Sequence, residues 1–285
     1  MHTNMDQTPL FISSNGTPIT EATLLSAMRS AKADQCEVLY IHSDLSFGTP
    51  NPNLKRSDLL ACLMATIGKL GVKTIIFPTF TFSFCNNEIF DRENTRSRMG
   101  ALNEYARKLP QAVRSSDPLM SSVAIGSNLD PVRKIGTASI GSGSTFDILH
   151  NTPNVRFLFF GVRLYLCFTY THYVEAQLGM PYRYPRDFTG TIVENGQPRT
   201  ATFSLFVRYQ GVEPTQTDYF EQYVLGKNLA PKIACGDGWI TTIREEDGFS
   251  AAADCLSTNP NCLLAQPYDP SNRDTTFIPH PMVAL

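Results

Sequence analysis

The sequence predicts an α/β protein, because helices alternate with strands in its first half. Ile19 to Ala33 carries apolar residues at helical spacing, and a short β-rich run, Cys36 to Ile41, follows it. Ser57 to Leu70 is a second such helix and leads into an apolar strand, Val72 to Phe77. This alternation is typical of α/β domains. We expect a single domain over residues 1–285, since neither a linker nor an internal repeat interrupts the chain.

A β-hairpin is the clearest feature of the second half. Asn195-Gly196 is the dipeptide that tight hairpin turns favour, and it predicts a hairpin over 188–206, within an extension that spans 188–208. We expect Ser57 and Ser144 to cap helices and Gly71 to end one. The other expected strands are 155–166, 233–235 and 239–244, and the other expected helices are 101–109, 146–150, 215–225 and 245–256.

Composition excludes several classes of protein. The net charge of -2 and pI near 6.2 argue against a nucleic-acid partner. No apolar run reaches the ~20 residues that span a bilayer, and the polar start shows no signal-peptide pattern, so we expect a soluble, cytoplasmic protein. The 7 cysteines lack CxxC spacing, which favours free thiols over disulfides or a zinc site. We therefore expect no metal.

The stretch from Phe168 to Tyr184 is the centre of the functional interpretation. It follows the apolar run 155–166, and it predicts a short helix that ends near Gly179. His172 and Glu175 are three residues apart, so they share one face of that helix. A carboxylate beside an imidazole fixes the tautomer and prepares the ring as a general base. The alternative is a structural helix whose His and Glu bond only to each other or to the backbone.

Polar loops follow two of the predicted strands. His42 to Gly48 is rich in hydroxyls and lies where α/β sheets place ligands, although many such loops look alike. Pro78 to Asp91 alternates aromatic and hydroxyl residues, which fits an edge strand or the wall of a groove. Gly141 to Asp147 resembles a nucleotide-binding glycine loop, but no suitable strand leads into it, so we reject a dinucleotide fold.

Four blocks of the sequence together resemble the aminoglycoside 3-N-acetyltransferase family. They are the Thr-x-x-His-x-x-Glu element with its Gly-x-Pro-Tyr-Arg-Tyr run at 169–184, the loop 42–48, the segment 78–100, and the block 114–126. The blocks occur in the expected order within positions 38 to 195. The resemblance implies a mixed α/β/α sandwich of that family's type, here with a β-hairpin extension, and not the common GNAT fold.

The implied activity is transfer of an acetyl group from acetyl-CoA, as co-substrate, to an amine of an aminoglycoside or related amino sugar. An ammonium cannot attack a thioester until a base removes a proton. His172 would be that base, and Glu175 would either orient it or hold the acceptor. Direct transfer needs no enzyme nucleophile, in agreement with the lack of a GxSxG motif. The expected partner is a small-molecule amine, not a membrane, and a homodimer is an open possibility.

The resemblance also assigns binding residues. Those expected to contact coenzyme A are His42, Ser43, Leu45, Ser46, Thr79, Ser122, Val123 and Ala124. Those expected to contact the acceptor are Glu88, Asp91 and Asp117. Two positions depart from the family pattern. Asp117 stands where the family has a histidine, and Asp44 places a carboxylate where a small hydroxyl is common, so it must point away from the phosphates or weaken their binding.

Three alternatives stay open on the sequence. The first is a biosynthetic N-acyltransferase that acts on a nucleotide-linked amino sugar for a surface polysaccharide. The second is a non-catalytic protein that binds CoA or a sugar. The third is a thiol hydrolase in which Cys85 pairs with His172, and it predicts inactivation by alkylation of that thiol.

Overall fold

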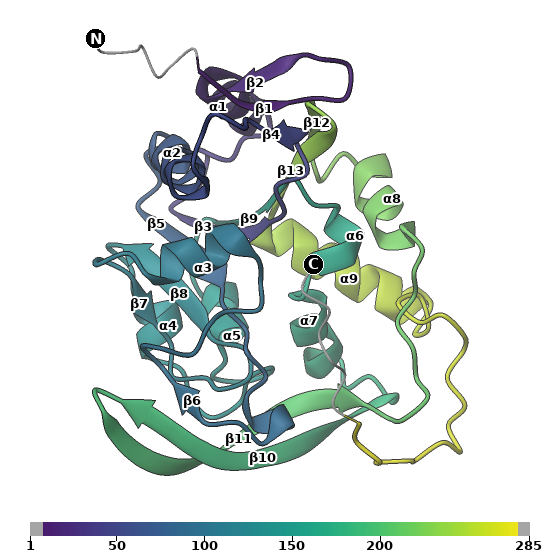
Figure 1. Ribbon diagram of the computed structural model, residues 1–285. Helices are drawn as coiled ribbons and strands as arrows, with labels where there is room; N and C mark the ends of the chain where they lie inside the picture. Colours follow the sequence, from purple (N-terminus) through teal and green to yellow (C-terminus); the bar gives the residue numbers. More distant parts are fainter. Residues whose placement is uncertain (1–7, 279–285) are drawn as a thin grey trace.

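A seven-stranded mixed sheet forms the centre of the molecule (Figure 1), and the computed structural model describes residues 8–278 of the chain. The strand order is β12-β13-β9-β3-β5-β8-β7, and only the three central strands, β9, β3 and β5, run parallel. The strands are β3 (Val38–Ser43), β5 (Thr74–Pro78), β7 (Val113–Arg114), β8 (Ser122–Gly126), β9 (Val155–Phe160), β12 (Lys232–Cys235) and β13 (Gly238–Arg244). The central strands are almost wholly buried and apolar, as expected of strands covered on both faces.

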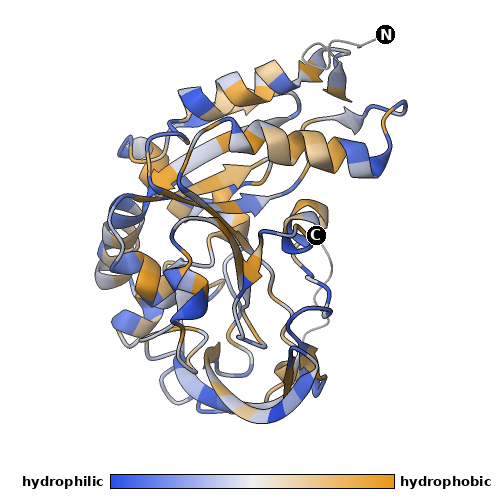
Figure 2. Ribbon diagram, turned by 90° about the vertical axis from the view of Figure 1, so that its left-hand side faces the viewer, coloured by the Kyte–Doolittle hydropathy of each residue, from blue (hydrophilic) through white to orange (hydrophobic). Residues whose placement is uncertain are grey.

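Helices cover both faces of this sheet, which confirms the α/β/α sandwich. Alternate strand residues point to opposite sides, so Leu39 and Phe77 join one core, with residues of α1–α3, while Tyr40 and Phe157 join the other, with residues of α5, α7 and α9. Figure 2 shows the orange, apolar strands enclosed between these layers. The helices are α1 (Glu21–Ser30), α2 (Arg56–Gly68), α3 (Ala101–Arg107), α4 (Asp130–Arg133), α5 (Thr145–His150), α6 (Leu164–Cys167), α7 (Thr171–Gln177), α8 (Tyr219–Gly226), α9 (Glu245–Thr258) and a 3₁₀ turn, η2 (Phe84–Asn86).

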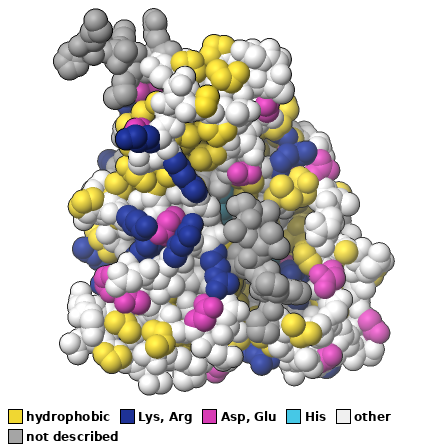
Figure 3. All heavy atoms as spheres, in the orientation of Figure 1, with side chains coloured by type: hydrophobic (Ala, Val, Ile, Leu, Met, Phe, Trp, Pro, Cys, Tyr) yellow, Lys and Arg dark blue, Asp and Glu magenta, His cyan; other side chains and the backbone are white. Residues whose placement is uncertain are grey.

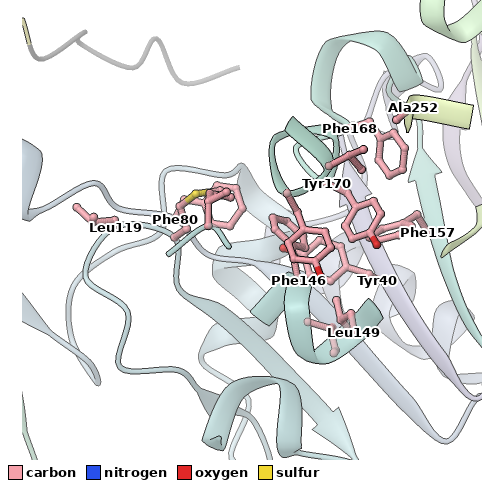
Figure 4. Close-up of a cluster of buried hydrophobic side chains, with 14 of the residues drawn as sticks. Tyr40, Phe80, Leu119, Phe146, Leu149, Phe157, Phe168, Tyr170 and Ala252 are labelled. Atoms are coloured by element: carbon pink, nitrogen blue, oxygen red, sulfur yellow. The ribbon is translucent and has the colours of Figure 1, made fainter. Parts of the chain in front are cut away.

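An aromatic cluster anchors α7 to the sheet. Tyr170, just before α7, lies against Phe157 of β9 with ring centroids 4.8 Å apart, and Phe146 of α5 packs edge-on to Tyr170 at 5.6 Å. Figure 4 shows these rings beside Phe168 and Tyr40, drawn from segments that are far apart in the sequence. Because close-packed interiors resist displacement, this cluster holds the start of α7 at a fixed position above the sheet.

A long two-stranded ribbon crosses the lower end of the molecule in Figure 1. It consists of β10 (Arg183–Glu194) and β11 (Gln197–Arg208), paired along their whole length, with β6 (Phe90–Asp91) added parallel to β10. Both turn residues, Asn195 and Gly196, have positive φ (51° and 73°), as a two-residue hairpin turn requires. The predicted hairpin is thereby confirmed, and it begins earlier than expected.

Several other local predictions differ from the structure. Helix α2 begins after Lys55, so Ser57 lies inside the helix and does not cap it, whereas Ser144 caps α5 as predicted. The strand expected over 155–166 ends at Phe160, because Gly161 adopts φ 76° against the carbonyl of Asp44 and α6 follows. Pro78 to Asp91 is mostly loop; the hydrogen bonds of Thr79, Thr81 and Ser83 to 118–121 replace the ladder of an edge strand.

A small N-terminal sheet, β2-β1-β4, was not predicted from the sequence. It contains β1 (Pro9–Ile12), β2 (Pro18–Thr20) and β4 (Thr49–Pro50). All seven cysteines are free thiols, as expected. Within residues 8–278, no helix is both long and apolar enough to cross a membrane.

Candidate functional site

The His–Glu pair of the sequence lies on α7, on the side of the sheet opposite α1–α3. His172 and Glu175 are one turn apart, and Nδ1 of the imidazole lies 2.7 Å from Oε2 of the carboxylate. Helix α7 ends before Gly179, which takes φ 63°, and the chain then turns into β10. This turn returns Tyr182 and Arg183 to Glu175.

Glu175 is a buried carboxylate held by three side chains. Its side chain is 2% exposed; Oε1 accepts a hydrogen bond from the hydroxyl of Tyr182 at 2.7 Å, and Oε2 faces His172 and Arg183. The Nε atom of Arg183 lies 2.9 Å from Oε2, but its angle does not make a hydrogen bond, so this contact is an ion pair. Burial alone raises the pKa of Glu175, but Arg183, His172 and Tyr182 outweigh it and lower the pKa to about 2.

The contacts of His172 determine which ring nitrogen is free. Nδ1 lies near both Glu175 and the Nη2 of Arg183, which is 2.9 Å away. Because the ionised Glu175 is the closer of the two, we assign the proton to Nδ1, which donates to the carboxylate and leaves Nε2 as the basic atom. Burial and then the charge of Arg183 lower the pKa of His172, against the opposite effect of Glu175. The ring is therefore neutral at neutral pH.

The imidazole borders a cavity of about 240 Å³, here named the His172 cavity. The His172 side chain is 33% exposed, so the ring is not enclosed in the interior. Apolar residues from five segments form much of the wall, namely Phe82, Met120, Ile140, Leu205, Val207, Phe277 and Ile278. Its charged groups are Arg183, Arg208 and Glu213. One further polar group stands out: the hydroxyl of Thr169 is buried without a hydrogen-bond partner in the described chain.

A second, smaller cavity of about 120 Å³, the His42 cavity, lies at the carboxyl ends of β3, β5 and β9. His42 is buried and stacks on Phe159 with ring centroids 5.5 Å apart, while its Nε2 atom finds no hydrogen-bond partner among residues 8–278. Burial lowers the pKa of His42 to about 3, so its ring is neutral. Leu166 and Cys167 form the wall of this cavity, and Thr169, two residues later, belongs to the His172 cavity.

A groove of about 740 Å³, the arginine groove, shares Ser43, Asp44 and Arg98 with the His42 cavity. It also contains Arg56 at the start of α2 and Arg96 before α3. Figure 3 shows dark-blue Lys and Arg side chains gathered on this face over α2 and α3. Positive charge beside a narrow apolar cavity suits a ligand with a phosphate-bearing end and a thin uncharged arm.

The loop predicted to contact coenzyme A lies at these two sites. His42 and Ser43 border the His42 cavity, and Ser43 and Leu45 border the arginine groove. Asp44 turns onto its own loop, where it accepts hydrogen bonds from the amide of Leu45 at 2.7 Å and the hydroxyl of Ser46 at 2.8 Å. Part of its charge is thereby neutralised by local donors.

Four other residues predicted to contact coenzyme A are buried, three in β8 and Thr79 directly after β5. Thr79 bonds to Ser121, Ser122 bonds to Tyr40, and Val123 and Ala124 are fully buried in β8. None of these four borders the two cavities or the groove described above. Their expected role stays a prediction.

The three acidic residues predicted to hold the acceptor are not brought together at His172. Glu88 borders the arginine groove, where it pairs with Arg98 at 3.0 Å. Asp91 bonds to residues of its own turn, chiefly Asn94. Asp117 is buried and accepts hydrogen bonds from two backbone amides and from Ser139. The hydrogen bonds of Asp91 and Asp117 give these two carboxylates a structural role.

Cys85 shows no sign of a nucleophile. Burial raises the pKa of its thiol to about 12, and it does not border the His172 cavity. The residues that the sequence interpretation did not single out are Thr169, Tyr182, Arg183 and Arg208. The first three lie in the stretch already quoted. The hairpin turn is the one sequence feature that predicts the position of Arg208. A two-residue turn pairs Glu194 with Gln197, and the same register places Arg208 opposite Arg183.

Comparisons with known proteins identify relatives of this chain. A family model described as aminoglycoside 3-N-acetyltransferase matches residues 41–256. Similar solved structures include AAC-IIIb in a binary complex with CoASH (TM-score 0.71, 15% identity, 88% of this chain and 99% of that chain). AAC-VIa bound to sisomicin has a TM-score of 0.68 at 16% identity, over 85% and 99% of the two chains. The YokD protein of Bacillus subtilis has a TM-score of 0.67 at 15% identity, over 85% and 100%. A sequence comparison with curated proteins finds no significant match.

Proposed function

The chain belongs to the aminoglycoside 3-N-acetyltransferase family, and from that premise we propose that it acetylates an amino group of an aminoglycoside or related amino sugar by direct transfer. It is a CoA-dependent N-acyltransferase, with acetyl-CoA as its co-substrate. The observation on which the proposal depends is the neutral imidazole of His172, oriented by Glu175 and bordering a cavity large enough for part of a sugar.

In the proposed mechanism, Nε2 of His172 removes a proton from the acceptor ammonium, and the resulting amine attacks the thioester carbon. The new C–N bond forms, the C–S bond breaks, the proton on Nε2 passes to the leaving thiolate, and the nitrogen releases its second proton to solvent. Glu175 stabilises the imidazolium that exists between these two transfers, because its carboxylate accepts the hydrogen bond of Nδ1. Arg183 and Tyr182 hold the carboxylate in place.

We further propose that Thr169 stabilises the tetrahedral intermediate. Its hydroxyl is buried without a partner in the described chain and belongs to a residue of the His172 cavity, one turn before the base. A buried hydroxyl without an acceptor is unfavourable in the free protein and becomes favourable when an oxyanion forms beside it. The backbone amides of β8 are engaged in the sheet.

The proposed position of acetyl-CoA follows from the two remaining sites. The arginine groove would take the phosphates, with Arg56 and Arg96, and the His42 cavity would take part of the pantetheine arm. The unpartnered Nε2 of His42 would accept a hydrogen bond from an amide of that arm. The chain from Leu166 to Thr169 then leads from this cavity to His172.

The test is thiol release from acetyl-CoA with a panel of amines that includes kanamycin and simple amino sugars. We expect turnover in the parent protein and a loss of roughly 100-fold or more in kcat for His172→Ala. His150→Gln is the matched control, because His150 also lies 2.8 Å from a glutamate, Glu245, but outside the His172 cavity. Full turnover in His172→Ala would exclude the mechanism. CoA binding without turnover of any amine would support the non-catalytic alternative.

A further inference from the structure

Two arginines face each other beside the catalytic base. Arg183 is the first residue of β10 and Arg208 the last of β11, and the two are direct partners across the antiparallel ribbon. Directly opposite residues project from the same face of a ribbon, so both guanidinium groups lie on one side. Both residues border the His172 cavity.

Only one of these arginines has a counter-ion. Arg183 forms its ion pair with Glu175 and donates to the carbonyl of Phe206 at 2.8 Å. Arg208 has no hydrogen bond or ion pair with any residue from 8 to 278. Glu175 and Glu213 act on it only at longer range, and burial and the charge of Arg183 outweigh them and lower its pKa. Two like charges directly opposite each other across a ribbon destabilise it. Arg208, which has no ion-pair partner in the described chain, therefore does not stabilise the fold through its charge.

We propose that Arg208 binds an anionic group, a phosphate or a carboxylate, that the acceptor carries close to the amine to be acetylated. This inference rests on the proposed function, and it narrows the acceptor to an acidic amino sugar. An arginine fork matches the planar or tetrahedral arrangement of such oxygens, and partial burial strengthens the pairing.

The co-substrate does not explain Arg208. When the thioester carbon is next to His172, the phosphates of acetyl-CoA are a whole pantetheine arm away, and the arm itself is uncharged. Arg208 borders the same cavity as His172 and is close enough to act on its protonation. An anion at Arg208 therefore belongs to the second substrate.

The charges of the cavity also fit a zwitterionic acceptor better than a polycation. Glu175 is neutralised by Arg183, so Glu213 is the one other carboxylate among the cavity residues that the structure describes. A compound with one ammonium and one anionic group can place the ammonium beside Glu213 or His172 and the anionic group beside Arg208. A compound with several ammonium groups would bring at least one of them towards Arg208, which repels it.

The experiment compares glucosamine, glucosamine 6-phosphate, an amino-uronic acid and kanamycin as acceptors in the thiol-release assay. The variants are Arg208→Met, which keeps the length of the side chain without its charge, and Arg208→Lys. Arg199→Met is the matched control, because Arg199 is on the same strand but pairs with Glu194. We expect the parent to prefer an acidic acceptor and Arg208→Met to lower kcat/KM for it by roughly 10-fold or more. The preference for the acidic acceptor over glucosamine should fall by a similar factor, the KM for acetyl-CoA should stay within about twofold, and Arg208→Lys should recover part of the loss.

A thermal melt separates binding from a structural role. Arg208→Met should be as stable as the parent or more so, because it removes a like-charge contact. The inference is overturned if kanamycin is preferred and Arg208→Met leaves every acceptor unchanged, an outcome that leaves the proposed acetyltransferase function intact. It is also overturned if the variant raises only the KM for acetyl-CoA. Failure of the parent to acetylate any amine would instead remove the proposed function.

Discussion

Nδ1 of His172 lies 2.7 Å from Oε2 of Glu175 and 2.9 Å from Nη2 of Arg183. Both neighbours are charged, with opposite effects on the ring: Glu175 favours the imidazolium and Arg183 opposes it. Because burial adds to the effect of Arg183, the neutral base is the resting form. The pKa of His172 therefore depends on both Glu175 and Arg183.

The first prediction concerns the pH dependence of kcat at saturating amine. A lowered pKa means that His172 is the neutral base at pH values above that pKa, so kcat should fall only as the pH drops below 6.5, the ordinary value. Arg183→Met removes a cause of the lowering and should move this acidic limb to higher pH. Measured pH profiles of both proteins test this. An acidic limb that stays in place would show that Arg183 does not control the base.

The second prediction is that Glu175 stabilises the fold at neutral pH. Its pKa is about 2 in the folded state, against an ordinary 4.5, so its stabilisation is present above pH 4.5 and is lost as the pH falls towards 2. Glu175→Gln also leaves Arg183 buried without its partner, and we expect a loss of about 3–5 kcal/mol at pH 7.

Urea unfolding at a series of pH values would measure this, and the difference from the parent should narrow between pH 4.5 and pH 2. Glu88→Gln is the control, because Glu88 forms a half-exposed ion pair and should cost at most about 1 kcal/mol. A difference that is independent of pH would contradict the assignment.

The third prediction tests the hydroxyl of Thr169. Thr169→Val keeps the shape of the side chain and should lower kcat by roughly 100-fold while KM for both substrates changes little. Because the hydroxyl has no partner in the described chain, its removal should not reduce stability. Thr169→Ser should restore most of the rate. Equal activity of the valine variant would exclude a role for the hydroxyl in the intermediate.

The fourth prediction concerns the contact between the ribbon and η2. A Cβ added at Gly190 would come within 2.7 Å of the ring of Phe84, which is buried. Gly190→Ala should therefore destabilise the protein by about 1–3 kcal/mol in urea unfolding. Gly68→Ala is the control, because nothing lies within 4 Å of its added Cβ at the end of α2, and it should be neutral or slightly stabilising. Equal stabilities would show that Phe84 moves aside freely.

Local features of the site and fold could be predicted because they depend on spacing along the chain. The i, i+3 separation on a short helix places His172 beside Glu175, and Asn195-Gly196 specifies the turn and thus the register of β10 and β11. The apolar runs of β3, β5 and β9 identify the buried strands. The small sheet with β1 and β2 was missed, because strands of four and three residues are too short to show periodicity.

Burial and charge pairing could not be predicted, because they depend on which segments pack together. Ser43 and Ser122 both lie in polar sequence, yet Ser43 borders a cavity and Ser122 is buried in the sheet. Asp117 accepts hydrogen bonds from Ser139 and from the backbone, which its sequence neighbours do not indicate. By itself the sequence determined the contact between His172 and Glu175 and the register that places Arg183 opposite Arg208. Only the tertiary structure decided that Arg183 would form an ion pair with Glu175 while Arg208 forms none within the described chain, since electrostatic pairing depends on distances in space and not on order along the chain.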